Sequence, residues 1–240
     1  MRGLTMGSLF DGIGGFPLAA VRRGITTVWA SEIEAFPIAV TKLRFPRMAH
    51  VGDITKLNGA KLAPVDIICG GSPCQDLSVA GARAGLAGAR SGLFMEQMRI
   101  AREMRAADQE RGRFGVDIRP RWMCWENVPG AFSSGTPKYE DFRIVLEEIV
   151  RISFPDEVIP SPYPGSWPDA GELRVGMSSL WHGAAWTHSI GALRSVENAS
   201  FSLLTSPGCL HRSFYLMFLV RRKIARRRSF KCITATQTGS

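Results

Sequence analysis

A cysteine and a glutamate about fifty residues apart carry the clearest chemical signal in this sequence. Cys74 lies in the polar segment Gly71-Ser72-Pro73-Cys74-Gln75, and Glu126 lies in Trp125-Glu126-Asn127-Val128. A nucleophilic thiol needs partial exposure and a stabilised thiolate, which polar neighbours allow. A carboxyl group with a raised pKa can donate a proton near neutrality. The pair therefore predicts covalent catalysis assisted by a general acid.

The other cysteines predict packing rather than chemistry. Cys69 and Cys124 lie inside apolar runs, where a cysteine is ordinarily a small buried hydrophobe. The five cysteines include no Cys-x-x-Cys pair, and only four histidines accompany them. We therefore expect no zinc cluster and no other metal.

A glycine turn precedes both motifs, in Phe10-Asp11-Gly12-Ile13-Gly14-Gly15. Its glycines allow a tight strand-to-helix turn and close approach of a ligand to the backbone. A G-x-G-x-x-G fingerprint would need glycine where Pro17 stands, which disfavours NAD and FAD. Glu32, about twenty residues on, could bind ribose hydroxyls, and Asp53 could accept a hydrogen bond from an adenine amino group. An adenosine ligand without a pyrophosphate suggests S-adenosylmethionine.

These residues belong to a predicted sequence of alternating strands and helices. We expect strands at 4–10, 26–30, 64–69 and 122–125, a further extended piece ending at 50–53, and helices at 16–23, 35–45, 91–105 and 142–152. Such alternation predicts a parallel α/β sheet with helices on both faces, a Rossmann-like doubly wound fold. The glycine turn, Glu32, Asp53, Cys74 and Glu126 all follow strand ends, so we expect them at one edge of the sheet.

The segments 10–15, 71–75 and 126–128 resemble the first, fourth and sixth motifs of DNA (cytosine-5-)-methyltransferases, and 89–94 resembles the fifth. The resemblance covers about residues 4–176. It implies methyl transfer from S-adenosylmethionine to C5 of a cytosine flipped out of duplex DNA. Cys74 would add to C6 of the base, and Glu126 would hold its N3/N4 edge and protonate N3.

The same resemblance assigns the remaining site residues. Cofactor contacts are expected from Phe10, Asp11, Gly12, Ile13, Gly14, Gly15, Glu32, Asp53, Ile54, Gly71, Pro73 and Leu93. Contacts with the DNA substrate are expected from Gln75, Ser78, Arg83, Arg90, Asn127 and Val128. The implied partners are double-stranded DNA and, in a restriction–modification system, a cognate restriction endonuclease.

The net charge of +9 is concentrated near the C-terminus, with seven Lys and Arg residues between 221 and 231. That run is interpreted either as a phosphate-contacting patch or as a solvated, unfolded tail, and the second reading is favoured. The chain has no signal-peptide stretch and no apolar run of the length that spans a bilayer. We therefore expect a cytoplasmic protein without a membrane partner.

The resemblance ends abruptly near residue 176. The family's Gln-x-Arg-x-Arg motif, target-recognition region and Asn-rich motif cannot be read in residues 177–240. If the gene is read one nucleotide upstream, however, the codons for 193–203 permit P-Q-R-R-K-R-I-F-L-V. We hypothesise that residues from about Met177 onward are translated out of frame. The expected domains are a catalytic core at 1–176 and an atypical, poorly folded basic tail at 177–240.

Three alternatives remain beside DNA methylation. The chain could be a truncated, inactive remnant with residual cofactor or DNA binding, or it could be a tRNA cytosine-5 methyltransferase. A thiol protease or amidase would need a histidine base. His50 is the sole histidine before residue 177, and nothing in its context marks it as one, so this third alternative is disfavoured.

Overall fold

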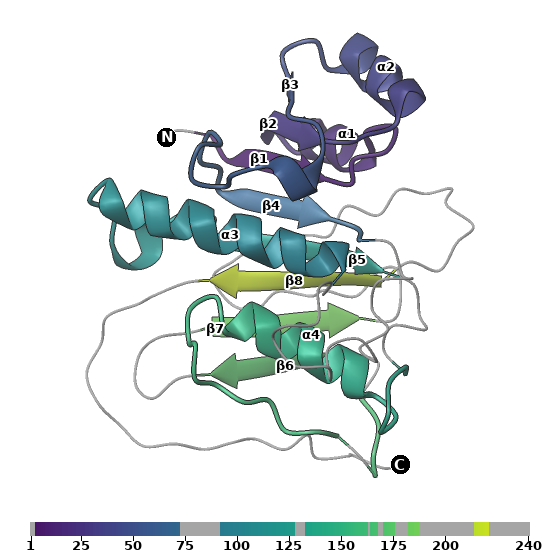
Figure 1. The fold of residues 1–240 in the computed structure, drawn as a ribbon, viewed down its shortest axis with the longest axis vertical. Coiled ribbons are helices and arrows are strands. Elements are labelled where there is room, and N and C mark those ends of the chain that lie inside the picture. The colour runs from purple at the N-terminus through teal and green to yellow at the C-terminus, as the bar shows by residue number, and fades with distance from the viewer. Residues whose placement is uncertain are drawn as a thin grey trace.

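The computed structural model describes residues 3–72, 92–127, 133–162 and 164–167, together with the strands at 170–175, 182–187 and 214–220. These strands form one sheet with the order β3-β2-β1-β4-β5-β8-β7-β6 (Figure 1). The strands are β1 (Thr5–Leu9), β2 (Thr26–Ser31), β3 (Ala49–His50), β4 (Ile67–Gly70), β5 (Trp122–Asn127), β6 (Ala170–Val175), β7 (His182–Thr187) and β8 (Phe214–Val220). The helices are α1 (Gly15–Val21), α2 (Ala35–Arg44), α3 (Leu93–Glu110) and α4 (Glu140–Val150), with short 3-10 turns η1 (Ile54–Lys56) and η4 (Gly115–Asp117).

The first five strands run parallel, which confirms the predicted Rossmann-like α/β sheet in this part of the chain. The chain builds β1, β2 and β3 outward and then returns to place β4 on the other side of β1. Ligands of open α/β sheets bind where the strand order reverses in this way. Leu9 pairs with Ser31 and Gly70, and Gly70 pairs with Trp125. The carboxyl ends of β2, β1, β4 and β5 therefore lie level.

Two predicted boundaries differ from the structure. The helix predicted at 91–105 spans Leu93–Glu110, because Ala107 and Asp108 still face the interior. The strand predicted at 64–69 begins at Ile67. Its predecessor Asp66 donates its backbone N–H to the hydroxyl of Thr5 at 3.1 Å instead of joining the ladder.

Three antiparallel strands extend the sheet beyond β5. β8 pairs with β5, β7 with β8, and β6 with β7. β7 and β8 lie beyond residue 176, where the sequence analysis placed no element. Strand formation depends strongly on the neighbours that a segment meets, so a local pattern gives a weak signal. The basic run at 221–231 lies outside the described residues.

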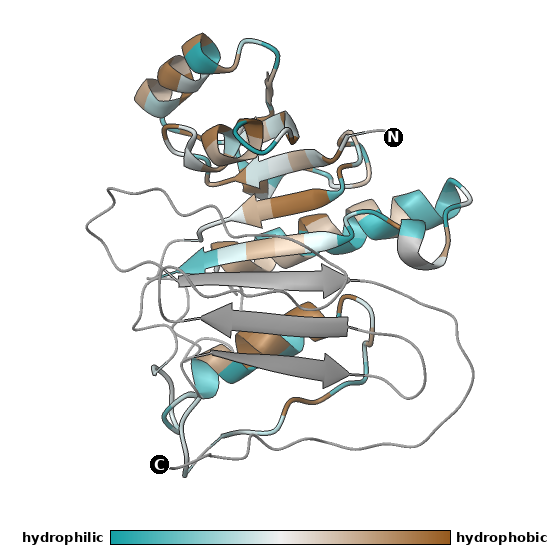
Figure 2. Cartoon of the chain, turned by 180° about the vertical axis from the view of Figure 1, so that it is seen from behind, coloured by the Kyte–Doolittle hydropathy of each residue, from teal (hydrophilic) through white to brown (hydrophobic). Residues whose placement is uncertain are grey.

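The core occupies both faces of the sheet. Helices α3 and α4 lie on one face of the sheet (Figure 1). The larger core cluster there includes Ile68, Met98, Trp125 and Leu146. On the other face, α1 contributes Ala20 to a smaller cluster. Figure 2 shows the apolar character of β4 from behind. Each large apolar side chain that is fully buried contributes about 1.5–3 kcal/mol.

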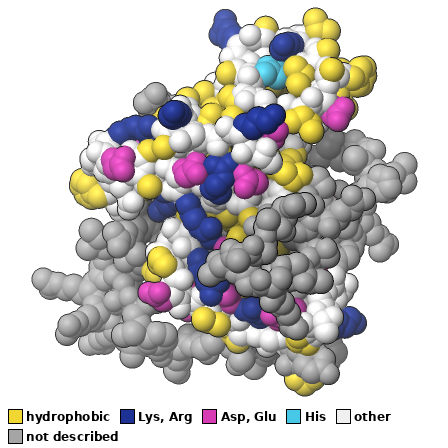
Figure 3. Space-filling view, in the orientation of Figure 1, with side chains coloured by type: hydrophobic (Ala, Val, Ile, Leu, Met, Phe, Trp, Pro, Cys, Tyr) yellow, Lys and Arg dark blue, Asp and Glu magenta, His cyan; other side chains and the backbone are white. Residues whose placement is uncertain are grey.

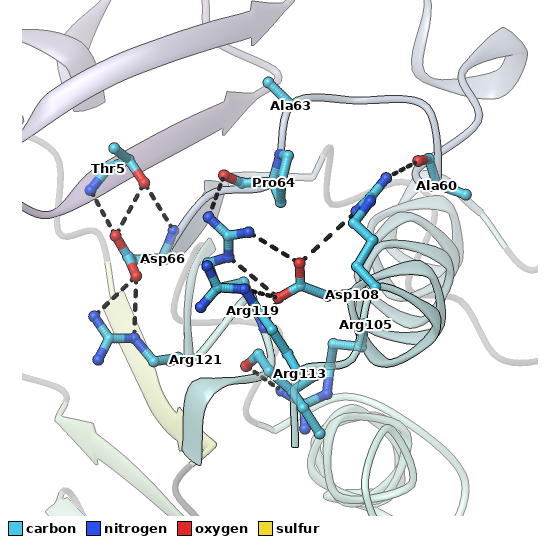
Figure 4. Close-up of polar contacts among 12 residues, drawn as sticks. Thr5, Ala60, Ala63, Pro64, Asp66, Arg105, Asp108, Arg113, Arg119 and Arg121 are labelled. Atoms are coloured by element: carbon cyan, nitrogen blue, oxygen red, sulfur yellow. Dashed lines mark hydrogen bonds and ion pairs between the residues drawn. The ribbon is translucent and has the colours of Figure 1, made fainter. Parts of the chain in front are cut away.

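Two carboxylates, the buried Asp108 and the partly buried Asp66, tie the elements together at the end of the sheet opposite the strand carboxyl termini (Figure 4). Asp108 is fully buried and binds Arg119 through both oxygens, at 2.9 and 3.1 Å. Burial raises the pKa of Asp108, but the hydrogen bonds and charge of Arg119 outweigh it and hold that pKa below its usual value. Asp66 accepts from Thr5 at 3.0 Å and pairs with Arg121 at 2.8 Å. These contacts fix β1, β4 and the approach to β5.

The face covered by α3 and α4 carries interleaved charges rather than one sign (Figure 3). Arg99 pairs with Glu96 and Glu103 at 2.5 and 2.9 Å, and Arg102 pairs with Glu148 at 2.6 Å. These arginines are therefore engaged within the protein. Among the helices that the structure describes, none is long and apolar enough to cross a bilayer.

Candidate active site

The glycine turn joins the end of β1 to the start of α1. Gly12 and Gly14 have φ angles of 53° and 87°, and Phe10 has a φ of 53° although it is not glycine. A bulky residue held in this region marks strain that is often stored at functional sites. Asp11 donates its backbone N–H to the carbonyl of Ser31 at 3.1 Å, which ties the turn to the end of β2. A side chain at Gly12 or Gly15 would meet no atom within 4 Å, so the backbone of the turn is open to a ligand.

Glu32 is fixed beside this turn by three backbone groups. Its Oε2 accepts from the N–H of Gly12 at 2.8 Å, and its Oε1 accepts from Ile33 and Glu34 at 2.7 and 3.0 Å. A carboxylate has about four lone-pair sites, so one remains for a ligand hydroxyl. Ile33, which the sequence analysis did not single out, leaves 68% of its surface exposed directly after Glu32. The sequence signal that could have identified Ile33 is an apolar residue directly after a carboxylate at a predicted strand end.

Asp53 occupies the next strand end and caps η1. Its Oδ1 accepts from the hydroxyl and backbone N–H of Thr55 at 2.8 and 3.0 Å. These hydrogen bonds lower the pKa of Asp53, and Lys56 acts in the same direction. Ser31 links this segment to β2 by donating to the carbonyl of Gly52 at 2.6 Å. The side chain of the neighbouring Ile54 is 4% exposed and belongs to the core.

Asp11 brings a buried carboxylate beneath the turn, with 5% of its surface exposed. Ser8, a residue that the sequence analysis missed, donates to its Oδ1 at 2.5 Å, whereas Oδ2 has no hydrogen-bond partner. Burial raises the pKa of Asp11 to about 6; the Ser8 hydrogen bond opposes this rise, and the charge of Glu32 adds to it. A cationic ligand above the turn would supply the missing counter-charge.

The ends of β4 and β5 form the second part of the site. A Cβ built on Gly71 would lie 2.6 Å from Oε2 of Glu126, so the carboxylate rests directly on the β4 backbone. Asn127 donates to the carbonyl of Ser72 at 3.2 Å, and the Trp125 indole donates to the Ser72 hydroxyl at 3.1 Å. Ser72, which the sequence analysis passed over as a polar neighbour, therefore binds the two strand ends together.

The structure thus gathers the predicted residues into two neighbouring groups. Asp11, Gly12 and Glu32 lie together around β1 and β2, and Gly71, Glu126 and Asn127 lie together around β4 and β5. Several predicted residues lie outside the described part of the chain, namely Pro73, Cys74, Gln75, Ser78, Arg83, Arg90 and Val128. Leu93 is described as the first residue of α3, packed against the core, and Ile13 is exposed in the turn.

The packing role predicted for Cys69 is confirmed. Its side chain is buried on β4, opposite Cys124 on β5. A hydrogen bond with Cys124 and burial raise the pKa of the Cys69 thiol, which leaves it a poor nucleophile. No group of His, Cys, Asp and Glu side chains within the described ranges could hold a metal ion.

Comparison with known proteins agrees with this geometry. A sequence model of the family described as C-5 cytosine-specific DNA methylase matches residues 4–153, more than half of the chain. Type II methyltransferase M.HhaI of Haemophilus parahaemolyticus is 36% identical over 103 residues, which cover 43% of this chain and 31% of that protein. Type II methyltransferase M2.BsuMI of Bacillus subtilis is 35% identical over 122 residues, covering 51% of this chain and 28% of that protein.

A relative with a different name is the DNA N-6-adenine-methyltransferase of Escherichia phage P1, 33% identical over 193 residues that cover 79% of this chain and 24% of that protein. The chain thus spans about a quarter to a third of these three relatives. Among solved structures, a putative DNA modification methyltransferase encoded within an E. coli prophage aligns with a TM-score of 0.50. It is 20% identical and covers 91% of this chain and 47% of its own, and this likeness concerns the fold.

Proposed function

Because this chain belongs to the C-5 cytosine-specific DNA methylase family, we propose that it transfers a methyl group from S-adenosylmethionine to C5 of cytosine in DNA. The observation that carries the proposal is the junction of β4 and β5, where the Glu126 carboxylate lies against Gly71. Cys74 follows Gly71 by three residues, which span at most about 10 Å, so its thiol is within reach of the Glu126 carboxylate. A carboxyl group beside a cysteine is what covalent activation of a pyrimidine requires.

The reaction needs one nucleophile and one proton donor from the protein. The Cys74 thiolate adds to C6 of the base, and N3 takes a proton from the Glu126 carboxyl group as the ring accepts the electron pair. C5 then becomes nucleophilic. When bound, S-adenosylmethionine supplies an electrophilic methyl group and departs as S-adenosylhomocysteine. Loss of the C5 proton to a base expels the Cys74 thiolate, and N3 returns its proton to Glu126.

The strand order suggests where the cofactor lies. Glu32 at the end of β2 offers a free lone pair to the ribose, and Asp53 offers an acceptor to the adenine amino group. The exposed side chain of Ile33 is placed to cover the adenine ring. The glycine turn follows β1, which lies between β2 and β4 in the sheet, so its residues would hold the methyl-bearing part of the cofactor between the ribose and the target base. The unpaired oxygen of Asp11 beneath that turn fits a ligand that carries a sulfonium and an ammonium charge.

Methylation of adenine at N6 is the competing reaction, because of the name of the phage P1 relative. The exocyclic amine of adenine can attack a methyl donor directly and needs no thiol. The cysteine and glutamate motifs of this chain therefore favour cytosine. The alignment covers only 24% of that phage protein, so its name does not decide the reaction of this chain.

The test is transfer of tritiated methyl from S-adenosylmethionine to mixed-sequence duplex DNA, followed by hydrolysis to nucleosides. We expect label in 5-methylcytosine, and we expect Cys74→Ala to abolish it. Label in N6-methyladenine would establish the competing reaction, and label in tRNA alone would redirect the substrate. No label from folded protein would support the inactive remnant.

We propose further that the chain leaves the ancestral reading frame at about Met177. The permitted sequence P-Q-R-R-K-R-I-F-L-V supplies the missing arginine-rich strand motif at the place where the family carries it. Sequencing the gene around codons 176–178 tests this origin, because a frame that continues unbroken from its ancestor would reject it. Restoring the shifted frame is expected to raise methyl transfer, since the restored strand would bring its arginines to the base.

A further inference from the structure

Asp11 holds a buried carboxylate whose charge the described part of the chain leaves uncompensated. Its exposed fraction is 5%, its Oδ1 accepts from the Ser8 hydroxyl at 2.5 Å, and its Oδ2 has no hydrogen-bond partner. Gln97 on α3, which lies against Gly70 of β4, is also buried without a partner, but its amide is neutral. Burying a charge costs far more than burying an amide unless an opposite charge pairs with it. Asp11 therefore calls for an explanation beyond local packing.

The titratable groups that face Asp11 oppose its ionisation. Burial raises the pKa of Asp11 to about 6, and the charge of Glu32 after β2 adds to this rise, against the Ser8 hydrogen bond. On β4, the pKa of the Cys69 thiol is raised by its hydrogen bond with Cys124, by burial and further by the charge of Asp11. Among the residues that the structure describes, Asp11 is paired with no cation.

The helices that follow the turn supply no counter-charge either, and the backbone beside Asp11 is open. Helix α1 contains no titratable residue, and Lys42 and Arg44 of α2 are exposed. A Cβ built on Gly12 would meet no atom within 4 Å. Because consecutive Cα atoms are about 3.8 Å apart, a cation bound against the Gly12 backbone would lie close enough to interact strongly with the Asp11 carboxylate in this poorly hydrated setting.

We propose that Asp11 makes the turn selective for the charged methyl donor: its carboxylate favours the sulfonium of S-adenosylmethionine over the uncharged thioether of S-adenosylhomocysteine. This inference rests on the proposed function, which places the cofactor at the turn. The two ligands share every other charged group and differ by one methyl group and one positive charge. Transfer of the methyl group removes that charge and leaves Asp11 uncompensated again, which weakens the binding of the product and favours its release.

The opposing explanation is that Asp11 only holds the turn through Ser8 and does not respond to the charge of the ligand. Asp53→Asn is the matched control, because it also replaces a carboxylate by an amide at the same edge of the sheet. The proposed contact of Asp53 is with adenine, which both ligands carry. Asp53→Asn should therefore change both dissociation constants by the same factor.

The experiment is calorimetric titration of the full chain and both variants with each ligand. At pH 7.5, S-adenosylmethionine should bind more tightly than S-adenosylhomocysteine, and Asp11→Asn should reduce this preference about tenfold, while Asp53→Asn keeps it within about twofold. Because the pKa of Asp11 is about 6, the unmodified chain should lose about tenfold of the preference between pH 7.5 and pH 5. A preference that Asp11→Asn leaves unchanged overturns the proposal. If that variant fails to fold, a preference in the unmodified chain that does not depend on pH overturns it.

Proton release on binding gives a second readout that needs no DNA. Titrations at pH 6 in buffers of different ionisation enthalpy should show about half a proton more released by S-adenosylmethionine from the unmodified chain than from Asp11→Asn. Equal release from the two proteins overturns the inference. If these differences appear but DNA is not methylated, the proposed reaction fails and the role of Asp11 stands. Methylation of DNA with an unchanged preference rejects the role of Asp11 alone, and failure to bind either ligand rejects both.

Discussion

The two halves of the sheet edge hold their polar groups in different ways. Around β1, β2 and β3, two carboxylates are held by backbone N–H groups: Glu32 accepts from three of them and Asp53 from that of Thr55, while the buried Asp11 keeps one oxygen unpaired. Around β4 and β5, two polar side chains instead press directly on bare backbone at Gly70 and Gly71. On that side, Gln97 has no partner.

This difference separates binding from turnover. A carboxylate already held by backbone donors needs no reorganisation when a ligand arrives, so the first half is preorganised for affinity. In the second half, the positions of the Gln97 and Glu126 side chains depend on close contacts with Gly70 and Gly71, and a single added methyl group would displace them. Substitutions around β1 and β2 should therefore change the affinity for cofactor, whereas substitutions around β4 and β5 should change the rate of reaction.

Cys74→Ser should lower methyl transfer more than any other substitution around β4 and β5. A serine hydroxyl is a far weaker nucleophile than a thiolate, so methyl transfer should fall by more than about a thousandfold. The dissociation constant for S-adenosylmethionine, measured by calorimetry, should stay within about twofold. A single-turnover rate within tenfold of the unmodified chain would remove the covalent mechanism.

Gly71→Ala should produce the next largest effect. The added Cβ would lie 2.6 Å from Oε2 of Glu126, so the carboxylate must move, and kcat should fall about a hundredfold. Gly3→Ala is the matched control, because its Cβ would meet its nearest atom at an ordinary 3.9 Å. Equal kcat values for the two variants would show that the Glu126 contact is not needed.

Glu32→Gln tests the first half. The substitution removes the charge and turns an NH2 group toward backbone donors, which should cost about 1.5–3 kcal/mol of binding. The dissociation constant for S-adenosylmethionine should rise about ten- to a hundredfold, while kcat at saturating cofactor changes little. A variant that loses kcat but keeps its affinity would contradict the division between the halves.

Asp11→Asn should affect the reaction least among these substitutions, and its main effect should be on the stability of the first half. Because the pKa of Asp11 rises from 3.8 to about 6 on folding, the folded state holds a proton between these values that the unfolded chain has lost. The free energy of unfolding should therefore fall as pH rises from 4 to 6. Asp11→Asn should remove that fall and gain on the order of 2–3 kcal/mol at pH 7.5, with no gain at pH 4.

Chemical denaturation of both proteins at pH 4 and pH 7.5 measures this effect. Saturating S-adenosylmethionine should narrow the difference at pH 7.5, because a cationic ligand offsets the charge of Asp11. If the free energy of unfolding changes with pH equally in both proteins, ionisation of Asp11 does not destabilise the folded state.

Much of the first half could be predicted from the sequence, because strand ends and glycines are local signals. The turn at 10–15 and the placement of Glu32 after β2 follow from short apolar segments and the twenty residues between them. The second half was harder to predict. The contact of Gly71 with Glu126 joins residues 55 positions apart, and β7 and β8 pair through neighbours that no local pattern specifies.

Gln97 shows both what a local sequence pattern can predict and what it cannot. Its spacing from Phe94 and Met98 predicts a place on the buried face of α3, so its burial could be read from periodicity. The absence of a partner could not, because it depends on Gly70 in a strand far away in the chain. A polar residue at a buried core position can mark a functional site, but the sequence pattern does not say what that function is.

The glycine pair at the end of β4 also has a consequence for how the gene tolerates change. Every codon for glycine begins with GG, and each single-base change that alters the amino acid adds a side chain. At Gly70 that side chain would meet the Gln97 amide, and at Gly71 it would meet the Glu126 carboxylate. Every amino-acid change that a single-base substitution makes at codons 70 and 71 therefore displaces one of these two side chains, so we expect fewer tolerated substitutions there than at Gly15, where an added Cβ meets no atom within 4 Å.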